Sequence, residues 1–373
     1  MSTVTEVKSG TMNSAARKFN FSAGPATLPE PVIEQAQQDL WSIAGSGIGI
    51  MEHSHRGPVF TKVIEEAEAD CRAIANISDD YEVLFLQGGA TTQFALIPMN
   101  FLGSGRTADY ADTGVWTKKA IKEAKRFGPV NIAFDGSATG YDHTPSDDEL
   151  KLTPDASYFH YCSNNTIYGT EFPNAPSSTT PLIADMSSDI FSRPLDVNAH
   201  AMIYAGAQKN LGPSGTVLAI IHKSLLETTN EGLPTMFEYR NHAAKGSCLN
   251  TPPTFGIYTM GQVFKWILRE GGLEAFAQRN QEKAALIYDV IDSGDFYSGV
   301  AQPGCRSMMN VSFRTPSAEL DAQFIAEAKE HDMDGLKGHR DVGGLRASIY
   351  NAFPKQGCAT LAQFMKDFAA KNG

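Results

Sequence analysis

The sequence predicts an α/β fold: a large domain with a mixed, mainly parallel sheet between helices, followed by a smaller α+β domain. Between residues 81 and 222, short apolar runs alternate with helical segments. Near-continuous apolar strands of this kind are typical of a sheet that helices cover on both faces. After about residue 254 the alternation stops. A chain of 373 residues is also too long for one small core.

The individual elements follow from local periodicity and turn residues. Helices are expected from Pro31 onward and over residues 61–75, 90–101, 115–126, 318–332 and 358–373. Strands are expected over residues 81–87, 107–111, 130–134, 158–162, 181–185, 201–205, 216–222, 306–314 and 345–351. One long helical stretch, residues 261–294, leads from the first domain to the second. We expect a flexible leader over residues 1–19, a large domain over 20–265 and a small domain over 266–373.

Composition narrows the classes of function. The net charge is −11 and there is no long basic cluster, which argues against nucleic-acid or anionic-membrane partners. The five cysteines are scattered without CxxC spacing, so neither a structural metal site nor a disulfide framework is expected. No apolar run is long enough to cross a bilayer, and the first residues lack a signal-peptide core. These features predict a soluble, cytoplasmic protein.

The most informative segment is residues 201–215, AMIYAGAQKNLGPSG. An apolar strand delivers Lys209 into a glycine-rich loop, where desolvation can lower the pKa of an amine. Such an amine suits a Schiff base with a carbonyl compound, above all pyridoxal 5′-phosphate. The alternative is a lysine that merely leaves a buried strand for water. This segment alone does not separate the two.

Two other strand ends carry residues that fit a cofactor site. Asp185 closes an apolar strand and could hold a pyridine nitrogen protonated, although it could also cap the following turn. Its spacing from Lys209 matches one strand–connection–strand unit. Gly88 and Gly89 lie between a strand and a helix, where backbone N–H groups can bind phosphate. A purely structural tight turn is the alternative there.

Aromatic and hydroxyl side chains could complete such a site. Trp116 opens a helix after a strand and could stack on a flat cofactor, although core packing is the commoner fate of tryptophan. Thr166 follows another strand end and could donate its hydroxyl to a ligand, or it could be an ordinary loop residue.

Arginines and histidines beside glycines point to an anionic substrate. His55 and Arg56 lie in HSHRG, His339 and Arg340 in KGHR, and Arg346 in GGLRASIYN. Arginine binds carboxylate and phosphate through two parallel hydrogen bonds, so this set suits a substrate with two or three anionic groups. Each residue alone could equally be a surface charge.

Taken with these residues, the chain closely resembles the phosphoserine aminotransferase family, within the fold type I, class V pyridoxal-phosphate enzymes. The shared blocks are NFSAGPATLP, HSHRG, QGGATTQF, TADYADTGVW, IADMSSDIFSRP, IYAGAQKNLGPSG, NTPPTFGIY and GLKGHRDVGGLRASIYNA. They span the chain from Asn20 to its C-terminus. Some relatives have GGGRGQF where this chain has GGATTQF, which puts a substrate role for Thr91 in doubt.

The resemblance implies roles for residues at matching positions. Lys209 would form the aldimine and move the α-proton, and Asp185 would pair with the ring nitrogen. The other cofactor-binding residues would be Trp116, Thr166, Gln208, the backbone of Ala90 and Thr91, and Asn250 and Thr251. The last two would come from a second subunit, which implies a homodimer with shared active sites. Arg346 would bind the substrate α-carboxylate, and the distal anionic group would be bound by His55, Arg56, His339 and Arg340.

The implied reaction moves the amino group of L-glutamate to 3-phosphohydroxypyruvate, giving O-phospho-L-serine and 2-oxoglutarate in serine biosynthesis. A second acceptor, 3-hydroxy-2-oxo-4-phosphooxybutanoate of pyridoxine biosynthesis, is also implied. Two alternatives remain open from the residues: another pyridoxal-phosphate enzyme acting on small neutral amino acids, and a binding protein without chemistry.

Overall fold

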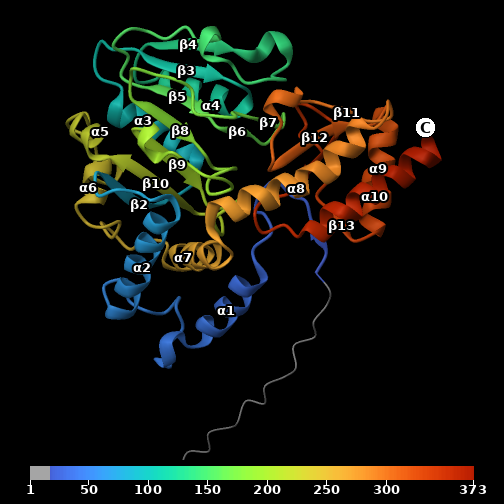
Figure 1. Ribbon diagram of the computed structural model, residues 1–373. Coiled ribbons are helices and arrows are strands. Elements are labelled where there is room, and N and C mark those ends of the chain that lie inside the picture. Colours follow the sequence, from blue (N-terminus) through green and yellow to red (C-terminus); the bar gives the residue numbers. More distant parts are fainter. Residues whose placement is uncertain (1–16) are drawn as a thin grey trace, which may run out of the picture.

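The computed structural model describes residues 17–373, so most of the predicted leader (residues 1–19) lies outside the described residues. A seven-stranded sheet of order β2-β10-β9-β8-β5-β3-β4 forms the centre of the larger part (Figure 1). Its strands are β2 (Tyr81–Gln87), β3 (Ala108–Asp112), β4 (Val130–Asp135), β5 (Phe159–Cys162), β8 (Leu182–Asp185), β9 (Met202–Gly206) and β10 (Thr216–His222). The predicted α/β class is confirmed.

Only β10 runs against its neighbours in this sheet; it pairs antiparallel with both β9 and β2, and the remaining pairs are parallel. The carboxyl ends of the other six strands therefore meet at one edge of the sheet. In the register at that edge, Asp185 lies between Cys162 of β5 and Tyr204 of β9. Ligands in open α/β sheets bind at such an edge.

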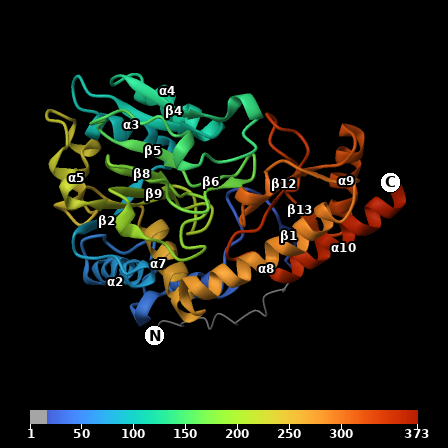
Figure 2. The same ribbon diagram turned by 45° about the horizontal axis from the view of Figure 1, so that its top comes forward.

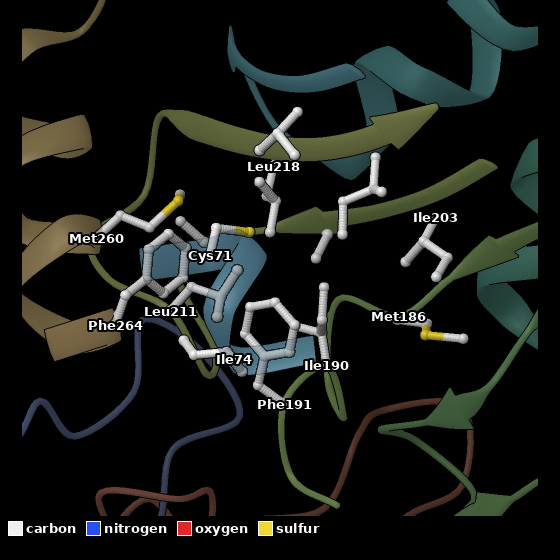
Figure 3. Packing of buried hydrophobic residues seen from close by; sticks show 14 of the residues in the cluster. Cys71, Ile74, Met186, Ile190, Phe191, Ile203, Leu211, Leu218, Met260 and Phe264 are labelled. Carbon is white, nitrogen blue, oxygen red and sulfur yellow. The ribbon is translucent and has the colours of Figure 1, made fainter. Parts of the chain in front are cut away.

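Helices cover both faces of the sheet, as its apolar strands predict. Helices α2 (Pro58–Ala75) and α7 (Thr254–Arg269) pack together on one face, and α3 (Ala90–Phe101) and α4 (Val115–Ala124) lie on the other. The alternation within β2 shows this directly, because Val83 and Phe85 join the first core whereas Leu84 and Leu86 join the second. Figure 3 shows the first core, in which Leu211 packs near Cys71 and Phe264.

A third core belongs to the smaller part of the chain. It lies between a three-stranded antiparallel sheet and the helices α8, α9 and α10. The strands are β11 (Ser298–Gly299), β12 (Asn310–Arg314) and β14 (Leu345–Ser348), and the helices are α8 (Gly272–Asp292), α9 (Ala318–Glu330) and α10 (Lys355–Asn372). Figure 2 shows α8 running from the larger part alongside α10.

Two details depart from the expected boundaries. The first described strand, β1 (Phe19–Asn20), pairs in parallel with β13 (Met333–Asp334), and Phe21 packs in the core of the smaller part. The predicted continuous helix over 261–294 is wrong, because it breaks between α7 and α8, where Gly271 has a φ of 101°. Helix α8 then contributes Phe276 to the first core and Ile287 to the third, the core of the smaller part.

The remaining elements are short. They are α1 (Glu30–Trp41), α5 (Lys223–Glu227), α6 (Tyr239–Ala243), β6 (Asn164–Asn165), β7 (Thr170–Glu171) and six single turns of 3₁₀ helix between Ile43 and Cys305. Among residues 17–373, the helices include none with the length and apolar character that a membrane crossing requires.

Candidate active site

Lys209 lies in the turn directly after β9, at the carboxyl edge of the sheet. Two contacts of Leu211 hold this turn: its side chain packs in the first core, and its N–H donates to the carbonyl of Ala207. Burial lowers the pKa of Lys209 below that of an ordinary lysine, and the negative charge of Asp185 opposes this. Within residues 17–373, no carboxylate oxygen lies within 4.0 Å of the Lys209 amine. A buried amine without an ion-pair partner has the properties that a nucleophile or a base requires.

Asp185 ends the neighbouring strand with one carboxylate oxygen engaged. Its Oδ1 accepts hydrogen bonds from the N–H and the hydroxyl of Ser187, at 2.9 and 2.6 Å. Ser187 Oγ in turn accepts the N–H of Gly206, at the end of β9. Asp185 thus caps the following turn, yet its Oδ2 accepts no hydrogen bond from residues 17–373. One oxygen fixes the side chain and the other is left for a ligand.

Trp116, Thr166 and Arg346 form a connected group beside Lys209. The Lys209 amine lies 5.5 Å from the centre of the Trp116 ring. The indole N–H of Trp116 donates to the Thr166 hydroxyl at 2.9 Å, and an Arg346 N–H donates to the Thr166 carbonyl at 3.0 Å. Arg346 Nε is buried and has no hydrogen-bond partner among residues 17–373. An arginine held this way offers its free N–H groups to an incoming anion.

The turn at Gly88 and Gly89 delivers the start of α3 to the same edge. Gly88 has a φ of 102°, which favours glycine, and α3 begins at Ala90. The first N–H groups of a helix have no partner within it and attract anions. The end of β9 approaches this point closely: a Cβ added to Gly206 would lie 3.4 Å from the Ala90 nitrogen and 2.9 Å from Gln208 Oε1.

These positions satisfy four separate requirements of pyridoxal phosphate. A buried amine suits the carbonyl carbon, a carboxylate oxygen suits the ring nitrogen, an indole suits the ring face, and a helix start suits the phosphate. The donor set of the described residues therefore fits this cofactor. No group of three or more His, Cys, Asp or Glu side chains within residues 17–373 is arranged to hold a metal ion.

The residues predicted for the distal anion are not all in one place. His339 is partly buried, and the charge of Arg346 is near enough to contribute, after burial, to the lowering of its pKa. Arg340 instead has a side chain that is 90% exposed, 3.6 Å from Asp341. His55 and Arg56 precede α2, and no hydrogen bond or ion pair within residues 17–373 joins them to Lys209 or Arg346.

Asn250 and Thr251 are bound to the end of β2, and no hydrogen bond within residues 17–373 joins them to Lys209. The side chain of Gln87, at the end of β2, donates to Asn250 Oδ1 at 2.9 Å and to the Thr251 carbonyl at 3.0 Å. Arg56 is close enough to this segment for its charge to lower the pKa of Cys248, against the stronger effect of burial. The segments carrying Arg56 and Asn250 are therefore neighbours on the same side of the molecule.

Sequence reasoning missed Ser187. The sequence does contain a hint of this contact, because two serines, Ser187 and Ser188, follow Asp185 after one residue. Small hydroxyl residues after a strand-end aspartate commonly accept and donate hydrogen bonds in such turns. Which of the two serines faces the carboxylate depends on the turn geometry, since Ser188 instead donates to the Asn164 carbonyl.

Comparisons with known proteins agree with this geometry. Residues 18–361 match the family model described as aminotransferase class-V. A phosphoserine aminotransferase of Desulfotalea psychrophila is 52% identical over 96% of this chain and 99% of its own. The solved phosphoserine aminotransferase of Bacillus circulans subsp. alkalophilus superposes with a TM-score of 0.94 at 48% identity, covering 96% of this chain and 100% of that one.

A third comparison concerns a cofactor-bound relative. The solved structure of PLP-bound phosphoserine aminotransferase from Trichomonas vaginalis has a TM-score of 0.89 and 39% identity, covering 94% of this chain and 100% of its own. Because identity near one half extends over almost the full length of both chains, this protein belongs to the class-V aminotransferases and, within them, to the phosphoserine aminotransferase family.

Proposed function

We propose that this chain uses pyridoxal phosphate to move the amino group of L-glutamate to 3-phosphohydroxypyruvate, giving O-phospho-L-serine and 2-oxoglutarate. The observation that carries the proposal is that two neighbouring strand ends bring two groups together. The buried Lys209 amine follows β9, and the Asp185 carboxylate, with only its Oδ1 hydrogen-bonded, ends β8. The family membership then selects the substrates.

The cofactor would be held by residues from several strand ends. Lys209 would bind its carbonyl carbon, Asp185 its ring nitrogen and Trp116 its ring face, with Thr166 and Gln208 at its polar edge. The N–H groups of Ala90 and Thr91 would take the phosphate. When bound, pyridoxal phosphate supplies a conjugated ring that accepts the electron pair left at the substrate α-carbon.

Lys209 is the base that removes the proton from the substrate α-carbon. A lysine whose pKa is lowered by burial is a free amine at lower pH than an ordinary lysine, so its Nζ can take the proton from the substrate α-carbon. Because the amine lies over the Trp116 ring and forms no ion pair with the described residues, 17–373, it is free to reach both the cofactor and the substrate.

Arg346 orients the substrate for that transfer. Its hydrogen bond to the Thr166 carbonyl fixes the guanidinium, and its unpartnered Nε is available to the α-carboxylate. The α-carbon of the bound amino acid is then held between Arg346 and Lys209, so the reacting carbon and the base are already in position for proton transfer.

The distal group of either substrate, a carboxylate in glutamate and a phosphate in the acceptor, requires a flexible set of cations. His339 and Arg340 would supply one part of this set and His55 with Arg56 the other. The same set would admit 3-hydroxy-2-oxo-4-phosphooxybutanoate as a second acceptor.

A homodimer would bring the separated residues into one site. Asn250 and Thr251 would reach the partner's cofactor phosphate, and Arg56 would move with them because it is their neighbour in this chain. Large apolar side chains are exposed before and beside these segments, including Trp41 at 80% and Met51 at 62% exposure. Side chains of this size are commonly covered by a partner subunit. We place the enzyme in the cytosol, because its five cysteines are unpaired and four of them are buried.

A coupled assay with glutamate as donor tests the proposal. We expect turnover with 3-phosphohydroxypyruvate, slower turnover with the four-carbon acceptor, and none with either after Lys209→Ala. Activity that survives this substitution would exclude Lys209 as the catalytic amine. If R340A and H339A leave the rate with the phosphorylated acceptors unchanged, an enzyme for small neutral amino acids becomes the better assignment.

A further inference from the structure

Three asparagines from distant parts of the chain bind three successive backbone carbonyls shortly after Asp185. The carbonyls belong to residues 190–192, in the turn that follows the Asp185 strand. Each asparagine donates one side-chain N–H: Asn210 to Ile190 at 2.9 Å, Asn351 to Phe191 at 2.8 Å and Asn280 to Ser192 at 2.9 Å. We call Asn210, Asn280 and Asn351 the asparagine triad.

The triad is also bonded internally. The backbone N–H of Asn351 donates to Asn210 Oδ1 at 3.0 Å, and the second N–H of Asn280 donates to Asn351 Oδ1 at 2.8 Å. All three side chains are buried, with exposures of 6%, 1% and 7% for Asn210, Asn280 and Asn351. Buried amides with this many directional bonds hold their neighbours in one arrangement.

The backbone that the triad holds is unusual at its centre. Phe191 has a φ of 58°, a left-handed conformation that is rare for a bulky residue. Such a conformation persists only where the surroundings determine it. Here the Phe191 carbonyl is bound by Asn351 and its side chain packs against Phe264. The turn after Asp185 is therefore fixed from the small-domain side.

Each member of the triad lies near a residue of the proposed site. Asn210 directly follows Lys209, and Asn351 lies just beyond β14, which carries Arg346. Asn280 is in α8, the helix that contributes to the first and third cores. The turn holding Asn351 is fastened further by the buried Lys283, whose amine donates to the carbonyls of Ile349 and Tyr350 at 2.9 and 2.7 Å.

We propose that the asparagine triad is a positioning device that sets Arg346 relative to Lys209 and Asp185. The proposal rests on the proposed function, in which Arg346 binds the substrate and Lys209 takes its proton. These residues come from two domains, and hydrophobic contact alone does not fix two surfaces against sliding. The triad supplies direction, because each amide must meet a particular carbonyl. An error of about 1 Å in such an alignment costs about 100-fold in rate.

The test uses the cofactor-loaded enzyme with N351A and N280A. We expect kcat/KM for glutamate to fall by ~100-fold in N351A, by the alignment argument, with cofactor content unchanged. The matched control is Tyr297→Phe, which removes one buried donor to a backbone carbonyl, Met365, within the core of the smaller part. The control should keep kcat/KM and lose only stability.

A double-substitution cycle separates positioning from general weakening. In the R346K background the guanidinium that the triad aligns is gone, so N351A should then have little further effect on kcat/KM. Additive losses of N351A and R346K would overturn the proposal, as would a wild-type kcat/KM in both N351A and N280A. If N351A does not fold, N280A decides the question by the same measurements.

Amide hydrogen exchange gives a readout that does not depend on activity. We expect faster exchange in N351A at residues 189–193 and 207–212, and no change there in Y297F. Unchanged exchange in both segments would overturn the proposal. An inactive wild-type enzyme would instead contradict the proposed function, and the exchange result would still decide whether the triad joins the two segments.

Discussion

The hydroxyl of Ser187 donates to Oδ1 of Asp185 at 2.6 Å, while the same hydroxyl oxygen accepts the N–H of Gly206. This one side chain therefore joins the ends of β8 and β9, the strands that carry Asp185 and lead to Lys209. It also fixes which of the two Asp185 oxygens remains available. Because of this contact, we expect the loss of the Ser187 hydroxyl to weaken cofactor binding.

For Ser187→Ala, we expect weaker cofactor binding and a lower kcat/KM. A hydrogen bond to a charged group contributes about 1.5–3 kcal/mol, which corresponds to a loss of roughly 10- to 100-fold. Titration of the cofactor-free protein with pyridoxal phosphate measures the affinity. Ser188→Ala is the matched control, because Ser188 is equally buried but bonds to Asn164. Equal losses in both variants would show that the Asp185 contact is not responsible.

For Lys209, the structure predicts a pH dependence of cofactor capture. Burial lowers the pKa of this amine, so in cofactor-free protein the capture rate should rise with pH through a midpoint below the ordinary lysine value of 10.5. The charge of Asp185 raises that pKa, so Asp185→Asn should move the midpoint lower still. Stopped-flow absorbance against pH measures both. A wild-type midpoint at or above 10.5 would contradict the prediction.

For Asp189, the structure predicts a pH dependence of stability. Burial, together with the charge of Glu171, raises the pKa of Asp189 to about 7, and Arg193 and the Ser163 hydroxyl oppose this. A carboxyl whose folded pKa is raised binds a proton more tightly in the folded state, so its contribution to stability is lost as pH rises toward 7. The wild type should therefore have a lower Tm at pH 8 than at pH 5.

The variant Asp189→Asn should reduce that difference by a few degrees, because the amide cannot ionise. Thermal unfolding of both proteins at the two pH values is the measurement. Asp196→Asn is a suitable control, since Asp196 lines the same pocket as Asp189 but is exposed. A wild-type Tm that increases from pH 5 to pH 8 would contradict the assignment to Asp189.

For Gly206, we predict that an added side chain would interfere sterically with phosphate binding. In Gly206→Ala the new Cβ would lie 2.9 Å from Gln208 Oε1 and 3.4 Å from the Ala90 nitrogen, at the proposed phosphate position. We expect the affinity for pyridoxal phosphate to fall by at least ~10-fold, an effect of about 1.4 kcal/mol. Gly212→Ala is the control, because its Cβ would meet nothing closer than 3.6 Å. Equal affinity in both variants would exclude a phosphate beside Gly206.

The sequence predicted the framework of the fold and the position of Lys209 and Asp185 at neighbouring strand ends. The strand over 81–87 and the helix over 90–101 agree with the structure to the residue, because Gly88 and Gly89 mark the boundary between two clear periodicities. Lys209 and Asp185 could be found because parallel strands bring their carboxyl ends together. Their pairing needed no knowledge of side-chain contacts.

Other features depend on contacts that no local pattern contains. Asn280 and Asn351 lie far from Asn210 in the sequence, and nothing near any of them marks its role as different from that of a surface amide. The helix break at Gly271 could have been predicted from the sequence, because two consecutive glycines interrupt the helical pattern there. The strong apolar periodicity on both sides of them concealed it. The separation of His55 and Arg56 from Lys209 depends on the placement of α2, which periodicity does not give.

The antiparallel strand β10 has a consequence for the order in which the molecule assembles. Because β10 returns directly beside β9, the turn that carries Lys209 is a short-range connection, and contacts of low sequence separation form early. Arg346, by contrast, reaches the site only when a strand from near the end of the chain has docked. The turn that carries Lys209 can therefore form before Arg346 is in place, so the amine proposed to bind the cofactor is positioned before the guanidinium proposed to bind the substrate.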